Sequence, residues 1–214
     1  MLAGVLWLGF LLGLRHAFEA DHLAAVTTLS ARVHRRRDVL RIAAAWGLGH
    51  TLTLTAAGTL IVAAGIVWSP DGKWARIGEL VAGGVLIWLG GDVLRRALRD
   101  RRAAVAAAAS SAAPALASRA LVVGGLHGME GSGAVVLVAL PALHSAVQAF
   151  LYLGLFGVGS IAGMLLSSLG VSWSLGYAAR RWQWSGRALQ LGIGITSIVL
   201  GSLMAIAALP VARH

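Results

Sequence analysis

The chain has 214 residues, yet it contains no cysteine and few charged side chains. Without cysteine it can form neither disulfide bonds nor thiolate metal sites. Only 12% of its residues are charged, against about 25% in a soluble domain, whereas 58% are hydrophobic and the mean hydropathy is +0.80. This balance predicts an integral membrane protein. Because cysteine is absent, His, Asp, Glu and backbone oxygen remain as ligands for any metal ion.

Two sequence motifs of enzymes are also absent. There is no Gly-x4-Gly-Lys-[Ser/Thr] phosphate loop, so the chain is not expected to be an ATPase of that type, and there is no His-Glu-x-x-His zinc motif. We therefore expect no enzymatic activity and no organic cofactor. An intramembrane metalloenzyme that uses scattered histidines is the least favoured alternative.

The net charge of +10 would suggest nucleic-acid binding in a soluble protein. Here the arginines lie between apolar runs, so membrane topology and anionic lipid explain them better. The lipid bilayer, and not nucleic acid, is therefore the expected partner.

Six apolar segments are long enough to cross a bilayer, which takes about 20 residues. All are expected to be helices, so the fold class is an all-α integral membrane protein. The segments cover residues 2–31, 39–67, 76–95, 119–141, 146–171 and 187–209.

Basic residues are concentrated in every second loop between these segments. The first, third and fifth loops carry most of the arginines, whereas the other loops and the C-terminus hold only Lys73, Arg76 and Arg213. Because basic loops stay on the cytoplasmic side, we expect a multi-pass protein of the cytoplasmic membrane with both termini outside.

The two halves of the chain resemble each other. An offset of 111 residues lays residues 13–20 (GLRHAFEA) over residues 124–131 (GGLHGMEG), and an offset of 110 lays 47–50 over 157–160. Three segments per half is an odd number, so the second half must be inverted, an architecture that recurs in transporters. We predict a first three-helix repeat in 1–97, a cytoplasmic Ala/Ser linker in 98–118 and an inverted second repeat in 119–214. A helical extension of the third segment is the alternative for the linker.

A dense polar cluster lies inside the first apolar segment. Residues 15–22 read RHAFEADH, which puts two histidines and two carboxylates in the middle of a segment long enough to span the bilayer. A charged side chain near the bilayer centre costs about 2.5–3.5 kcal/mol on insertion scales, so residues of this kind are usually functional. The cluster predicts a metal site that uses His16, Glu19, Asp21 and His22.

A regular helix cannot bring both histidines of this cluster to one ion. His16 and His22 are six residues apart, and they would differ by about 240° in angle and about 9 Å in rise. Either the segment is distorted near the motif, or some of the polar residues bind the metal while others orient its ligands, as carboxylates do for metal-bound histidines.

Two later segments carry the remaining candidate ligands. His50 lies in residues 47–51 (GLGHT), and His127 and Glu130 lie in residues 127–133 (HGMEGSG). With residues 15–22, these motifs resemble those of the nickel/cobalt permease family: Arg-His-Ala-x-Asp-Ala-Asp-His, Leu-Gly-His-[Ser/Thr], and the His-Gly-Leu-Ala-Gly-Ser element of its smaller, urease-accessory-type relatives. Glu19 stands where the family has Asp.

The resemblance implies a secondary permease that moves Ni²⁺ or Co²⁺ across the cytoplasmic membrane through a His/Asp/Glu site near the midplane. A membrane factor that delivers the metal to a nickel enzyme is the alternative. A homo-oligomer and a metal-enzyme maturation partner are both compatible with the sequence.

Overall fold

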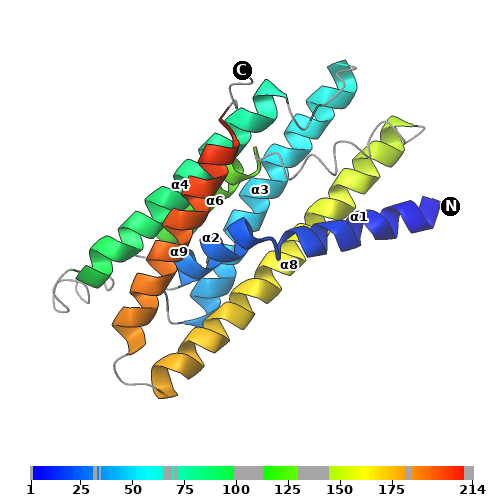
Figure 1. Ribbon diagram of the computed structural model, residues 1–214. Coiled ribbons are helices and arrows are strands. Elements are labelled where there is room, and N and C mark those ends of the chain that lie inside the picture. Colours follow the sequence, from blue (N-terminus) through cyan, green and yellow to red (C-terminus); the bar gives the residue numbers. More distant parts are fainter. Residues whose placement is uncertain are drawn as a thin grey trace.

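The computed structural model contains only helices as regular secondary structure within the part of the chain that it describes (Figure 1). It describes residues 2–30, 33, 35–64, 69, 72–98, 113–129, 145–181 and 185–209. The all-α class is confirmed for these residues. The helices are α1 (Leu2–His16), α2 (Ala20–Ser30), α3 (Arg36–Ala64), α4 (Lys73–Leu98), α6 (Ala113–His127), α8 (Ala146–Arg181) and α9 (Ser185–Ala207).

The first apolar segment is not the single helix that we expected over residues 2–31. α1 ends at His16 and α2 begins at Ala20. At the break, the amide of Phe18 donates to the carbonyl of Arg15 and the amide of Glu19 donates to the carbonyl of His16. These hydrogen bonds link residues three apart instead of four, as in a 3₁₀ turn, and they end the regular α-helix. The segment is therefore distorted at the motif, which was the first of the two alternatives.

Three described helices are long and apolar enough to cross a membrane: α4, α8 over Val147–Tyr177, and α9 over Arg187–Ala207. α1 and α2 are too short on their own, with 15 and 11 residues. α3 has 29 residues, among them several threonines and His50, and it is not one of these three. α6 contributes a shorter apolar helix, and the end of the expected segment 119–141 lies outside the described residues. Six spans therefore remain a prediction.

The predicted linker overlaps the start of α6. Residues 113–118, which we assigned to the linker, are the first residues of this helix. The remainder of the linker after Leu98, residues 99–112, lies outside the described part of the chain.

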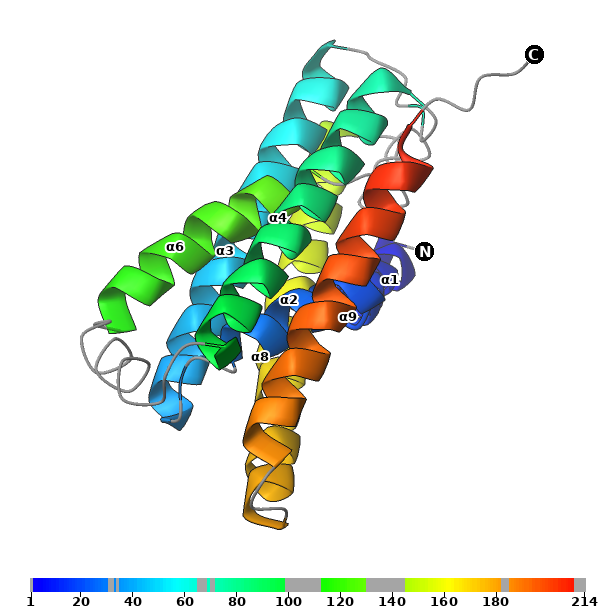
Figure 2. The same ribbon diagram turned by 60° about the vertical axis from the view of Figure 1, so that its left-hand side comes forward.

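The helices pack in pairs that join the two halves of the chain. α1 lies against α8, α3 against both α6 and α8, and α4 against α9 (Figures 1 and 2). Contacts between α1 and α8, and between α3 and α6, follow both sequences in ascending order, so each of these pairs runs parallel. In the third pair Gly83 meets Gly201 and Gly90 meets Gly194, so α4 and α9 run antiparallel.

Glycines allow the parallel pairs to approach closely. A Cβ atom at Gly13 on α1 would overlap the carbonyl oxygen of Phe156 on α8. The backbones therefore touch, as small residues allow at helix–helix interfaces in membranes. Equivalent overlaps with the carbonyl oxygens of Phe10, Leu121 and Trp46 would arise from Cβ atoms at Gly159, Gly49 and Gly124, respectively.

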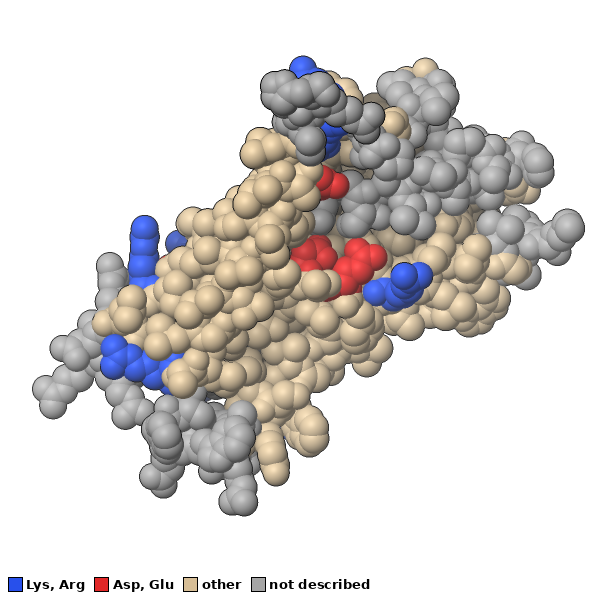
Figure 3. All heavy atoms as spheres, viewed as in Figure 1, with Lys and Arg blue, Asp and Glu red and all other residues tan. Residues whose placement is uncertain are grey.

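Charged side chains are few along the length of the bundle. Figure 3 shows basic side chains at the lower left end of the molecule, where α4 ends and α9 begins, and acidic side chains grouped midway along the same face. Arg95 and Arg96 lie in the last turn of α4. Exposed apolar side chains fit a surface in contact with lipid, and on α8 they include Phe150, Val158, Leu166 and Trp173.

Candidate metal centre

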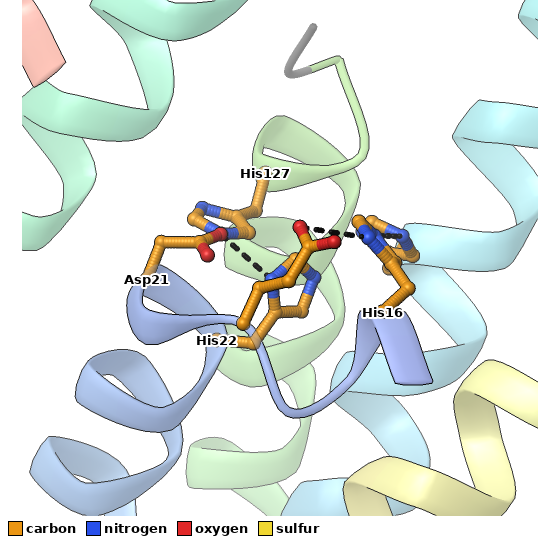
Figure 4. A network of polar contacts seen from close by, with 6 residues as sticks. His16, Asp21, His22 and His127 are labelled. Carbon is orange, nitrogen blue, oxygen red and sulfur yellow. Dashed lines mark hydrogen bonds and ion pairs between the residues drawn. The ribbon is translucent and has the colours of Figure 1, made fainter. Parts of the chain in front are cut away.

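Four histidines and one aspartate meet at the break between α1 and α2. His16 is the last residue of α1, Asp21 and His22 lie in the first turn of α2, and His127 is the last residue of α6. Figure 4 shows these side chains pointing toward one another. His50 joins them from the middle of α3. In one regular helix His16 and His22 would lie on different faces. Because the chain turns between them, their ring centroids lie only 4.4 Å apart.

The first group of ligand atoms belongs to His16, His22 and His50. One ring nitrogen from each lies within 4.8 Å of the others, and Nε2 of His16 lies 3.2 Å from Nε2 of His50. Nδ1 of His16 lies 3.1 Å from Oε2 of Glu19. Since an ionised carboxylate can only accept, Nδ1 of His16 donates this bond, and in the neutral ring the Nε2 lone pair then faces His50. Carboxylates orient metal-bound imidazoles in the same way.

The second group belongs to Asp21, His22 and His127. Oδ2 of Asp21 accepts a hydrogen bond of 2.7 Å from Nε2 of His127 (Figure 4). The same oxygen lies 2.7 Å from Nδ1 of His22, at an angle outside hydrogen-bond geometry. One carboxylate thus stands between two imidazoles. Nitrogen and oxygen ligands of this kind suit Ni²⁺, Co²⁺ and Zn²⁺.

The centre is shielded from solvent. His22 and His127 have no exposed surface, and His50 and His16 are 2% and 4% exposed. Neither ring nitrogen of His22 has a hydrogen-bond partner among the described residues. Leaving a buried polar group without a partner costs about 1–3 kcal/mol, so packing alone does not account for an imidazole at this position. A cation that accepts its lone pair would supply the missing interaction.

The structure sorts the predicted site residues into three sets. Glu19 touches the outer nitrogen of His16, and its side chain is 40% exposed, so it stands outside both groups of ligand atoms. Glu130 lies outside the described residues. The residues brought together are His16, Asp21, His22, His50 and His127.

Sequence reasoning missed the aromatic side chains that wall the centre. Trp46 on α3 is fully buried, with its ring centroid 5.3 Å from that of His127. Phe156 on α8 is also buried, with its ring centroid 5.5 Å from that of His16. The sequence did hold a signal for both. Trp46 lies four residues before His50 and so shares its helix face, and the offset of 110 lays Trp46 over Phe156.

The fold and the site together define a helical membrane protein with a candidate site for a divalent transition-metal ion. The chain belongs to the NicO family, described as "High-affinity nickel-transport protein", which it matches over residues 2–209. The family predicted from the three motifs is thereby confirmed, and a family of transport proteins agrees with the expectation that the chain is not an enzyme.

One curated relative has a different role in its name. The chain is 27% identical over 209 residues to the "Urease accessory protein UreH" of Bacillus sp. (strain TB-90), and the match covers 94% of this chain and 90% of that protein. No solved structure matches the chain significantly.

Proposed function

We propose that the protein is a permease that carries Ni²⁺ or Co²⁺ across the cytoplasmic membrane, with His16, Asp21, His22, His50 and His127 as its metal ligands. The observation that carries the proposal is the burial of four imidazoles and one carboxylate at one point of an apolar helical bundle. Placing ionisable side chains inside a membrane costs free energy, so such residues usually have a function. In a family of nickel-transport proteins, that function is binding of the transported metal.

The membrane potential can drive such a permease without a second ion. Moving a dication inward is favoured by about 4.6 kcal/mol per 100 mV of inside-negative potential, twice the value for a single charge. The chain has no phosphate loop that would couple the movement to ATP. Uptake down the electrical gradient is therefore the direction that we propose.

The proposed architecture is two inverted three-helix repeats with both termini outside. Exchanging the two halves by the offsets of 110 and 111 turns the α1–α8 pair into the α6–α3 pair and leaves the α4–α9 pair unchanged. The observed helix directions are consistent with this exchange, because the first two pairs run parallel and the third runs antiparallel. In inverted-repeat transporters the site lies between the halves, which then rock around it.

Metal uptake into proteoliposomes tests the proposal. We expect the purified protein to take up Ni²⁺ or Co²⁺ saturably under an inside-negative potential, with Zn²⁺ and Mn²⁺ measured alongside to rank the metals. His16→Ala should reduce the initial rate by at least about tenfold, because it removes a ligand and the partner of Glu19.

Thr28→Val is the matched control for this experiment. Thr28 is buried on α2, and its hydroxyl donates a hydrogen bond to the carbonyl of Ala25 in its own helix. The control should transport at nearly the wild-type rate. Uptake that persists in His16→Ala, or an absence of potential-driven uptake in the wild type, would contradict the permease.

A maturation factor for a nickel enzyme is the second candidate, and the name of the Bacillus relative favours it. The same ligands would then hold the metal without net transport. Metal that binds to the protein but never enters the liposomes, and that passes instead to an added metal-free urease, would support this role over the permease.

A further inference from the structure

His22 belongs to both groups of ligand atoms in the metal centre. Its ring centroid lies 4.4 Å from that of His16, 5.0 Å from that of His50 and 4.7 Å from that of His127. It therefore stands between an all-imidazole group on one side and a group with a carboxylate on the other. Neither ring nitrogen has a hydrogen-bond partner among the described residues, although Nδ1 lies 2.7 Å from Oδ2 of Asp21.

The five side chains do not converge on a single point. Each group of three keeps its ligand atoms within 4.8 Å of one another, and the five together form two such groups instead of one. Ligands of one ion lie no more than about 4.2 Å apart, which is twice a metal–nitrogen distance of about 2.1 Å. One ion therefore cannot use all five ligands without a rearrangement of the centre.

The two groups differ in how closely the present distances between their ligand atoms match those of a bound metal ion. Nε2 of His16 and Nε2 of His50 lie 3.2 Å apart, so bonds of about 2.1 Å from both to one ion would meet at an angle of about 100°, between octahedral and tetrahedral values. These two nitrogens share a hydrogen bond, whose proton must leave before an ion can lie between them. Oδ2 of Asp21 and Nε2 of His127 lie 2.7 Å apart, at hydrogen-bond distance. They must separate by a few tenths of an ångström and give up the shared proton before an ion can lie between them.

The two groups also correspond to each other through the likeness of the two halves. The offset of 111 lays His16 over His127, and the offset of 110 lays Trp46 over Phe156. In the structure His16 packs against Phe156 and His127 packs against Trp46. Each histidine thus meets an aromatic ring from the opposite half. Asp21, His22 and His50 have no ionisable counterpart in the second half, since the same offsets lay them over Ser132, Gly133 and Ser160.

We propose that the metal ion occupies two alternative positions that share His22, one formed by His16, His22 and His50 and the other by Asp21, His22 and His127. The inference rests on the proposed metal site, and it adds a transfer step within it. An ion held by His22 exchanges its other ligands between the two sides as the halves move. The transfer exchanges metal–ligand bonds, and the ion keeps its oxidation state throughout. The proton between Asp21 and His127 is released as the ion enters that position, and one proton returns between His16 and His50 as the ion leaves theirs.

Cobalt(II) absorption spectroscopy on the full-length protein in detergent tests the two positions, because the bands report ligand type and geometry. His127→Gln should leave the all-imidazole position, and His50→Gln should leave the position that contains Asp21. We expect each variant to bind Co²⁺ saturably, with an affinity reduced by no more than about 100-fold. The two variants should give different spectra, and a weighted sum of these should reproduce the wild-type spectrum.

Two further substitutions isolate the same two metal positions through other residues. Asp21→Asn should reproduce the spectrum of His127→Gln, and His16→Gln should reproduce that of His50→Gln, so a single variant that misfolds does not decide the test. Ser167→Ala is the control, since Ser167 is buried on α8 and bonds to the carbonyl of Met164. Its spectrum should equal that of the wild type.

The outcomes separate this inference from the proposed permease. Loss of Co²⁺ binding in both His50→Gln and His127→Gln, or the same spectrum in both, would mean one shared position and would overturn the inference. Two distinct spectra in a protein that moves no metal into liposomes would support the two positions and refute the permease. If transport requires both, each variant should bind Co²⁺ and yet transport it at least about tenfold more slowly.

Discussion

Replacing His22 by leucine is expected to abolish metal binding while leaving the metal-free protein at least as stable as the wild type. His22 is the one residue common to both groups of ligand atoms, so its loss damages both. The affinity for Ni²⁺ should fall by more than about 100-fold, beyond the effect of removing a group that merely orients a ligand. Isothermal titration calorimetry with Ni²⁺ measures this directly.

The expected stability has a separate cause. The imidazole of His22 is fully buried, and its Nε2 has no hydrogen-bond partner among the described residues. Its Nδ1 lies 2.7 Å from Oδ2 of Asp21, which keeps its hydrogen bond from His127 when His22 is replaced. An apolar side chain of similar size removes a polar group whose missing partner costs about 1–3 kcal/mol. Thermal unfolding without metal should therefore give a Tm equal to or above that of the wild type. A lower Tm with metal binding retained would show that His22 has a packing role and is no ligand.

Gly159→Ala is expected to destabilise the fold by about 1–3 kcal/mol, because overpacking of this kind forces the backbone to shift. The added methyl would overlap the carbonyl oxygen of Phe10, and it would also lie 3.0 Å from the amide nitrogen of Leu14. Both are backbone atoms of α1, which cannot move aside as a flexible side chain can. The unfolding temperature in detergent should fall accordingly.

Gly154→Ala provides the matched control on the same helix. Gly154 lies five residues earlier on α8, and a Cβ atom there has no neighbour within 4 Å. Alanine in a helix is favoured over glycine by about 0.5–1 kcal/mol, so this variant should be as stable as the wild type or slightly more stable. If both variants shift the Tm alike, the close approach of α1 and α8 does not contribute to stability.

The sequence allowed the helical class and the order of the helices to be predicted, because apolar runs of bilayer length are a strong signal. It did not allow the end of α1 to be located. Residues 2–31 are apolar on both sides of the motif, and no proline marks the break at residues 17–19. The turns there follow from local hydrogen bonds of Phe18 and Glu19, and hydropathy contains no information about them.

The residues of the candidate site could be predicted from the sequence, but their arrangement in two groups that share His22 could not. His16, Asp21, His22, His50 and His127 were all chosen from the motifs, because ionisable side chains in apolar segments are rare. That Glu19 would support His16 from its outer nitrogen, and that His22 would stand between two groups, depends on how α2 leaves the break. Spacing along the sequence does not determine that direction.

Two helices end at the metal centre, since His16 and His127 are the last residues of α1 and α6. The aligned peptide dipoles leave about half a negative charge at each C-terminus. α2 begins beside them with its positive end, which Asp21 in its first turn offsets. The two helix C-termini and the Asp21 carboxylate together therefore create a negative potential around His22. Metal bound in an anionic chelate should be repelled there, so the free dication is the form of the metal that we expect to reach the centre.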